Sequence, residues 1–153
     1  MKVLIVEDEV LLAMELESEI EAAGHEIVGM AADSKEALSL IDGADPEFAF
    51  VDIHLLDGPT GITVGQSLSL RGIPYVFVSG NVKRIPEDFA GALGAIEKPY
   101  TMNGLQNALS FIEGYVGGRK AELTPPPSLL LSPALMSDPS FSGKIAHTSM
   151  DRP

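Results

Sequence analysis

The spacing of apolar residues constrains the fold of this chain more than any other feature of its sequence. Short apolar runs, typical of buried strands, alternate with longer segments in which apolar residues recur every three or four positions, as on one face of a helix. This alternation predicts an α/β fold built on a mainly parallel sheet. The expected strands are Val3–Val6, Glu26–Ala31, Phe48–Asp52, Tyr75–Ser79 and Ala95–Glu97.

Two helices are expected in the first third of the chain. The first covers Glu9–Ala23, where one apolar row should face the sheet and Gly24 supplies a typical stop. That row is Leu12, Leu16, Ile20 and Ala23. Asp33, followed three residues later by Glu36, forms a capping-box pattern that predicts a second helix from Asp33 to about Ile41.

Three further helices complete five βα units within residues 1–117. The third covers Ile62–Leu70, and the fourth, short and opened by Pro86, covers Glu87–Leu93. The fifth begins after Thr101, which is a suitable N-cap. Its expected core-facing row is Leu105, Ala108, Leu109, Ile112 and Val116.

The composition changes beyond Gly117-Gly118. Residues 118–153 contain three consecutive prolines and many serines without a sustained period, which predicts a Pro/Ser-rich C-terminal tail. Because a purely solvated tail would not usually carry Leu129-Leu130-Leu131, we expect it to be partly disordered and partly packed on the domain or on a partner. Phe111 and Tyr115 lie four residues apart on the fifth expected helix, away from its core-facing row. They are either the residues that this tail contacts or ordinary surface residues.

Length and charge exclude several classes of protein. A chain of 153 residues suits one core, and it has no apolar run near the roughly 20 residues that span a bilayer. The net charge of −12 argues against a nucleic-acid partner, which would require a Lys/Arg surface. Acids follow the first apolar run at once, which leaves no room for a signal peptide, and cysteine is absent. We therefore expect a cytoplasmic protein without membrane contact.

Polar residues follow four of the expected strands. Glu7-Asp8-Glu9 follows the first, Asp52 ends the third, Ser79 ends the fourth, and Lys98-Pro99 follows the fifth. Because the carboxyl ends of parallel strands surround the functional crevice of such folds, these side chains should lie at one edge of the sheet.

The residue types at this edge predict metal-assisted phosphoryl chemistry. Clustering Glu7, Asp8 and Asp52 is unfavourable unless a cation or retained protons reduce their charge, and carboxylates completed by water suit Mg²⁺. Lys98 can offer a positive charge to a phosphoryl group, and the Ser79 hydroxyl can donate a hydrogen bond to it. Asp52 is then placed to accept the group covalently.

Each of these residues also has an ordinary interpretation. Asp8 or Glu9 taken alone is more readily a cap of the first helix, and a lone strand-end Asp52 is usually structural. Ser79-Gly80 alone indicates a turn. The functional interpretation depends on polar residues occurring in order at the ends of four strands.

Four motifs together resemble the bacterial response-regulator receiver domain, over about residues 1–117. They are Val3–Glu9, Phe48–Asp52 with Asp57-Gly58, Tyr75–Gly80, and Glu97–Tyr100. The resemblance implies a flavodoxin-like doubly wound parallel sheet of five strands in the order 2-1-3-4-5 with five helices.

The resemblance also implies roles for individual residues. Asp52 would be phosphorylated, Asp8 would bind Mg²⁺ directly, and Glu7 would act through water. The backbone carbonyl of His54 would be a further ligand, and Ser79 and Lys98 would contact the phosphoryl group. The side chains of His54 and Asn81, each two residues beyond a site residue, are expected to tune the rate of dephosphorylation.

Two positions depart from the receiver pattern. Ala95 stands where receivers usually have the Tyr or Phe that turns inward on activation, and Leu56 stands where proline is common. The run Phe77-Val78-Ser79-Gly80 instead resembles the Phe-Ala-Thr-Gly signature of a subgroup of single-domain receivers that lack this aromatic. Readout must then proceed through Ser79 without the usual switch.

The resulting hypothesis is a stand-alone response regulator that is not an enzyme beyond its own phosphorylation and dephosphorylation. A histidine kinase or histidine phosphotransfer protein would supply the phosphoryl group, with docking on Leu11 and Met14. Output would go through a downstream protein, a phosphorelay or a homodimer. The alternatives are a Mg²⁺-dependent phosphohydrolase with Asp52 as nucleophile, in which His54 replaces the usual second Asp, and a pseudo-receiver that only binds.

Overall fold

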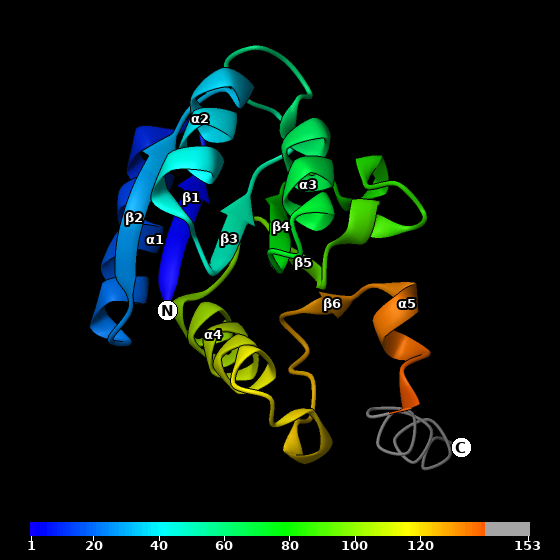
Figure 1. Ribbon diagram of the computed structural model, residues 1–153. Coiled ribbons are helices and arrows are strands. Elements are labelled where there is room, and N and C mark those ends of the chain that lie inside the picture. Colours follow the sequence, from blue (N-terminus) through cyan, green and yellow to red (C-terminus); the bar gives the residue numbers. More distant parts are fainter. Residues whose placement is uncertain (140–153) are drawn as a thin grey trace.

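A six-stranded sheet forms the centre of the computed structural model, which describes residues 1–139 (Figure 1). The strand order is β2-β1-β3-β4-β5-β6; the first five strands are parallel and β6 is antiparallel to β5. The strands are β1 Lys2–Val6, β2 Glu26–Ala31, β3 Phe48–Val51, β4 Tyr75–Ser79, β5 Gly94–Glu97 and β6 Leu130–Leu131. The predicted five parallel strands and their order are confirmed, and β6 is an addition.

Five α-helices accompany the sheet within residues 1–139. They are α1 Val10–Ala22, α2 Ser34–Ala44, α3 Gly61–Leu70, α4 Met102–Val116 and α5 Pro133–Met136. Two predicted caps are present, since Asp33 accepts from the N–H of Glu36 and Thr101 accepts from that of Gly104. Among these described residues, no helix combines the length and the apolar character that crossing a membrane requires.

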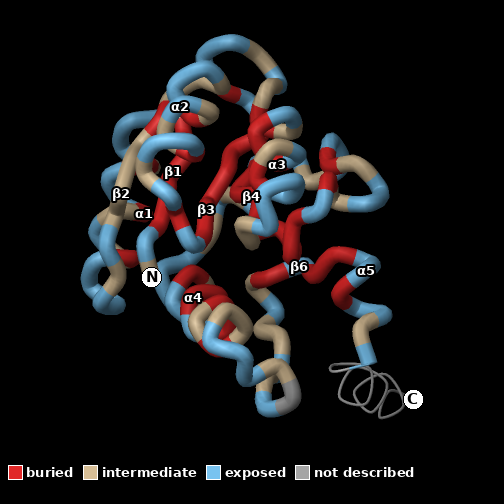
Figure 2. Tube along the Cα trace, in the orientation of Figure 1, coloured by how far each residue is buried: buried red, intermediate tan, exposed pale blue. Residues whose placement is uncertain are grey.

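Two apolar clusters cover the two faces of the sheet, and the buried residues follow its strands (Figure 2). Alternation along each strand divides the side chains between them: Val3 and Ile5 join the cluster with α1 and α4, whereas Leu4 and Val6 join that with α2 and α3. Because every central strand is buried on both faces, only the residues at the strand ends can present polar groups to solvent.

The prediction of a fourth helix over Glu87–Leu93 is wrong. The segment between β4 and β5 contains only two 3₁₀ helices, Val82–Arg84 and Phe89–Gly91. Phe89 and Ala90 have φ values of 55° and 48°, in the left-handed region, which interrupts an α-helix. The buried hydroxyl of Tyr75 donates a 2.7 Å hydrogen bond to the Ala90 carbonyl and thereby holds this turn.

The apolar rows of α1 and α4 differ in part from expectation. In α1, Leu16 and Ile20 are buried as predicted, but Ala13 is buried with them while Leu12 is half-buried and Ala23 is exposed. In α4, the predicted row is buried except for half-buried Val116. Phe111, expected on the outer face, is also buried, because the chain beyond α4 returns and covers that side.

Residues 120–136 form three short elements against the domain: the 3₁₀ helix Lys120–Glu122, β6 and α5. Leu129, Leu131 and Leu135 are buried in the same cluster as Phe111. The boundary at residue 117 stays a prediction, and residues 140–153 of the expected tail lie outside the described residues.

Candidate functional site

Three acids converge at the point where the strand order reverses. Glu7 and Asp8 follow β1 and Asp52 follows its neighbour β3, in parallel register with Val6 opposite Val51. The Asp52 N–H donates to the Val6 carbonyl at 2.8 Å, which holds the two strand ends together. Each acid offers a carboxylate oxygen, and these three atoms lie within 4.8 Å of one another. The predicted acidic cluster therefore exists.

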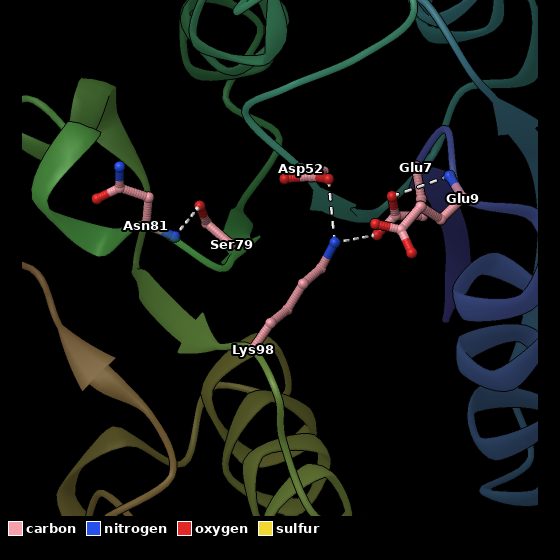
Figure 3. Close-up of polar contacts among 6 residues, drawn as sticks. All are labelled: Glu7, Glu9, Asp52, Ser79, Asn81 and Lys98. Atoms are coloured by element: carbon pink, nitrogen blue, oxygen red, sulfur yellow. Dashed lines mark hydrogen bonds and ion pairs between the residues drawn. The ribbon is translucent and has the colours of Figure 1, made fainter.

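Lys98 reaches this cluster from the end of β5 (Figure 3). Its Nζ lies 2.6 Å from Glu7 Oε1 and 3.0 Å from Asp52 Oδ2. Its backbone N–H donates to the Ser79 carbonyl at 2.9 Å, which fixes the start of the side chain beside β4. One ammonium thus bridges two nearly buried carboxylates.

Burial and charge shift the pKa values in this group. Burial raises the pKa of Glu7 to about 7; the hydrogen bond from Lys98 opposes this rise, and the nearby Asp52 charge adds to it. Burial alone would lower the pKa of Lys98, but its hydrogen bonds to Glu7 and Asp52 outweigh that effect and raise its pKa. Lys98 is therefore fully cationic near neutral pH, whereas Glu7 retains a proton part of the time.

Ser79 lies at the end of β4. Because β3 lies between β1 and β4 in the sheet, Asp52 stands between Ser79 and Glu7 (Figure 3). Ser79 is 1 % exposed, and its Oγ accepts a 3.1 Å hydrogen bond from the Asn81 N–H. Since that bond uses a lone pair of the oxygen, the hydroxyl proton can still be donated to a ligand. The side chains of Asn81 and His54 are exposed at the rim.

Ala95 is buried on β5 opposite Phe77 of β4, so the position of the usual aromatic is occupied by a methyl group inside the core. Leu56, the other departure, is exposed in the loop after Asp52. That loop is fastened to α2 by Asp57, which accepts hydrogen bonds from Ser34 and Thr60 that lower its pKa.

Gly61 is a supporting residue that the sequence did not single out. It begins α3, and its N–H donates to the Ile53 carbonyl at 2.9 Å. A Cβ at this position would lie 1.9 Å from the Asp52 carbonyl oxygen and 2.7 Å from Ile53 Cα. The backbone that carries Asp52 therefore rests directly on α3. A glycine directly before an expected helix was the only signal in the sequence.

The donor set fits a hard divalent cation such as Mg²⁺. Three carboxylates face one ammonium, so the cluster lacks positive charge when all three are ionised. Carboxylate oxygens, with water in the remaining positions, are the ligands that Mg²⁺ prefers. Glu9 is the N-cap of α1, but its side chain makes no cap hydrogen bond. Capping of α1 by the Glu9 side chain therefore does not explain why acids gather at this strand end.

Asp8→Asn should raise the thermal stability of the metal-free protein and remove its response to Mg²⁺. The substitution relieves repulsion among the acids but removes a ligand, whereas Mg²⁺ at one hundred times its dissociation constant should stabilise the unsubstituted protein by about 2.7 kcal/mol. Thermal unfolding with chelator and with Mg²⁺ measures both effects. Glu9→Gln, at an exposed neighbour, is the control that should respond normally. An undiminished Mg²⁺ response in Asp8→Asn would contradict the assignment.

The fold and the acidic cluster define a doubly wound α/β protein with a polar crevice at the switch point of its sheet. The model of the response regulator receiver domain matches residues 3–110. The chain belongs to this family, whose members act in two-component signal transduction.

Relatives support the same assignment. The chain is 34 % identical over 85 residues to the phyllosphere-induced regulator PhyR of Methylorubrum extorquens, covering 54 % of this chain and 32 % of PhyR. It is 30 % identical over 112 residues to the transcriptional regulatory protein PdtaR of Mycobacterium tuberculosis, covering 71 % of this chain and 54 % of PdtaR. It thus spans about a third to a half of these curated relatives.

Solved structures show the same fold. The response regulatory domain of mrkE from Klebsiella pneumoniae aligns with a TM-score of 0.68 at 30 % identity, covering 76 % of this chain and 98 % of that domain. The receiver domain of PhyR from Erythrobacter litoralis aligns with a TM-score of 0.65 at 28 % identity, covering 71 % of this chain and 86 % of that domain.

Proposed function

We propose that this chain is a response regulator that accepts a phosphoryl group on Asp52 in a Mg²⁺-dependent reaction, from a phosphohistidine of a histidine kinase or phosphotransfer protein. The observation that supports it most strongly is the placement of Asp52 Oδ2, 3.0 Å from Lys98 Nζ and within the cluster formed with Glu7 and Asp8. A carboxylate in such surroundings can attack a phosphorus atom while its neighbours stabilise the transferring oxygens.

The reaction forms one bond and breaks one. An Asp52 oxygen attacks phosphorus in line, the bond from phosphorus to the imidazole nitrogen breaks, and the nitrogen keeps the electron pair. Asp8, Asp52 and the His54 carbonyl would hold Mg²⁺, with Glu7 acting through water, and the ion would supply positive charge to neutralise the phosphoryl oxygens. Lys98 would exchange its contact with Asp52 for one with a phosphoryl oxygen, and the Ser79 hydroxyl would donate to another. Water later hydrolyses the acyl phosphate and resets the site.

Exposed apolar side chains beside the crevice support a protein partner. Leu11 is 80 % exposed and Met14 is 53 % exposed near the start of α1, which directly follows Glu7 and Asp8. We propose that the phosphodonor protein docks there, so that its phosphohistidine faces Asp52. The signal is then passed by protein contact or by transfer of the phosphoryl group.

Incubation with a small phosphodonor, acetyl phosphate, tests the proposal. In Mg²⁺ the intact mass should increase by a single phosphoryl group per chain, and chelation of the metal should prevent this, because Asp52 needs charge neutralisation to attack. Phosphate release from an ester such as p-nitrophenyl phosphate should not exceed one equivalent. Continued turnover would favour the phosphohydrolase alternative, and no labelling would favour a receiver that only binds.

A further inference from the structure

The connection from β2 to α2 contacts both halves of the acidic site. The Glu7 N–H donates to the Ala31 carbonyl at 2.9 Å, and the Leu56 N–H donates to the Ala32 carbonyl at 3.0 Å. Glu7 directly follows β1, whereas Leu56 belongs to the loop that follows Asp52. Residues 31–34 therefore join two segments of the site that come from different strands.

Two reciprocal hydrogen bonds, similar to a capping box, hold this connection in one conformation. The Asp33 side chain accepts from the Glu36 N–H at 2.8 Å, and the Glu36 side chain accepts from the Ala32 N–H at 3.0 Å. Each bond satisfies a backbone donor at the start of α2. The connection can therefore serve as a fixed support for the loop that it contacts.

Asp57 fastens the loop after Asp52 to this support. Its carboxylate accepts hydrogen bonds from the Ser34 hydroxyl at 2.5 Å, from the Ser34 N–H at 3.2 Å and from the Thr60 hydroxyl at 2.6 Å. These bonds hold the pKa of Asp57 below its usual range, so the carboxylate stays ionised at neutral pH. Ser34 is the first residue of α2, where a free N–H and the helix dipole both favour a negative charge. Charge and hydrogen bonding therefore act together at this contact.

The fastened loop is a tight turn that contains His54. The Ile53 carbonyl accepts from the Gly61 N–H at 2.9 Å, and Leu55 and Gly58 exchange backbone hydrogen bonds of 2.8 and 3.1 Å. Ile53 and Leu55 are buried, whereas His54 between them is exposed. The next two residues, at the tip of the turn, make its contacts with the β2–α2 connection. The position of the His54 backbone therefore depends on both the buried flanks and the fastened tip.

We propose that Ser34 and Asp57 are positioning residues, which set the affinity of the acidic site for Mg²⁺ by holding the loop that carries the His54 carbonyl. Neither side chain is itself a ligand. Removal of groups that orient metal ligands typically lowers metal affinity by roughly 10- to 100-fold. The inference rests on the proposed function, because it requires that this site binds Mg²⁺. It adds a determinant of affinity that lies outside the acidic cluster.

Calorimetric titration of the metal-free, full-length protein with Mg²⁺ tests this role. Asp57→Ala should weaken binding by about tenfold. Ser34→Ala, which leaves every charge in place and removes one hydrogen bond, should weaken it by about threefold. Ser34→Thr keeps the hydroxyl and should restore the affinity. Ser39→Ala, at an exposed serine of the same helix, is the control and should bind as tightly as the unsubstituted protein.

Hydrogen exchange of the metal-free proteins gives a second readout that does not depend on Mg²⁺. In Ser34→Ala the Leu55 and Leu56 amides should exchange at least about threefold faster than in the unsubstituted protein, while the amides of β4 should be unchanged. Equal acceleration throughout the sheet would show a general loss of stability and would overturn the positioning role. Unaltered Mg²⁺ affinity in both Asp57→Ala and Ser34→Ala would overturn it and leave the proposed function standing. Absence of Mg²⁺ binding to the unsubstituted protein would overturn both proposals.

Discussion

Substitution Asp52→Asn should abolish incorporation of a phosphoryl group from acetyl phosphate in Mg²⁺. The amide cannot form the acyl phosphate, although it keeps the shape of the side chain and can still contact Lys98. Because the substitution removes one of three neighbouring carboxylates, the variant should fold at least as stably as the unsubstituted protein in the absence of metal. Intact mass after labelling, together with thermal unfolding, measures both effects.

Glu9→Gln is the matched control for the loss of phosphoryl incorporation in Asp52→Asn. Glu9 is exposed and lies beside the same crevice, where its backbone N–H donates to Glu7 Oε2 at 3.2 Å, a contact that the substitution leaves intact. Its labelling should equal that of the unsubstituted protein. Full labelling of Asp52→Asn would place the acceptor on another residue.

Substitution Gly61→Ala should destabilise the protein by about 3 kcal/mol, the upper range for overpacking. The added methyl would meet the backbone of Asp52 and Ile53, and neither can move away as a flexible side chain would. The strand end should shift, so phosphorylation of any folded fraction should slow as well. Urea unfolding and the initial rate of labelling measure the two effects.

Gly43→Ala is the corresponding control within a helix. Gly43 lies in α2, where a Cβ would meet nothing within 4 Å. Alanine is preferred to glycine in a helix by roughly 0.5–1 kcal/mol, so this variant should be slightly more stable than the unsubstituted protein. Equal stability of both variants would contradict the close packing of Gly61 on the strand end.

Local sequence patterns with fixed geometric consequences were sufficient to predict the strands and the acidic cluster, whereas the sheet order came from the resemblance to receiver domains. Apolar runs mark the strands, and parallel strands bring their carboxyl ends to one edge. Glu7, Asp8 and Asp52 therefore had to lie together once the order was assigned. Lys98 joins them, since it directly follows the fifth strand.

Long-range contacts account for what the sequence did not indicate. Pro86 and the residues after it suit a helix locally, but left-handed Phe89 and Ala90, held by the Tyr75 hydroxyl, replace it with a 3₁₀ turn. Two leucines paired with a strand far along the chain give no periodic signal, so β6 was missed. Phe111 lies off the predicted core row of its helix because its apolar neighbours include Leu129, Leu131 and Leu135, which have no helical period.

Identification of the phosphorylated residue in the unsubstituted protein tests the central claim most directly. After reaction with acetyl phosphate in Mg²⁺, borohydride reduces an acyl phosphate to an alcohol, and mass spectrometry of the peptides locates the reduced residue. We predict reduction at Asp52 and at no other acid. Reduction at Glu7, Asp8 or Asp57, or a phosphoryl group on a histidine or serine, would contradict the account.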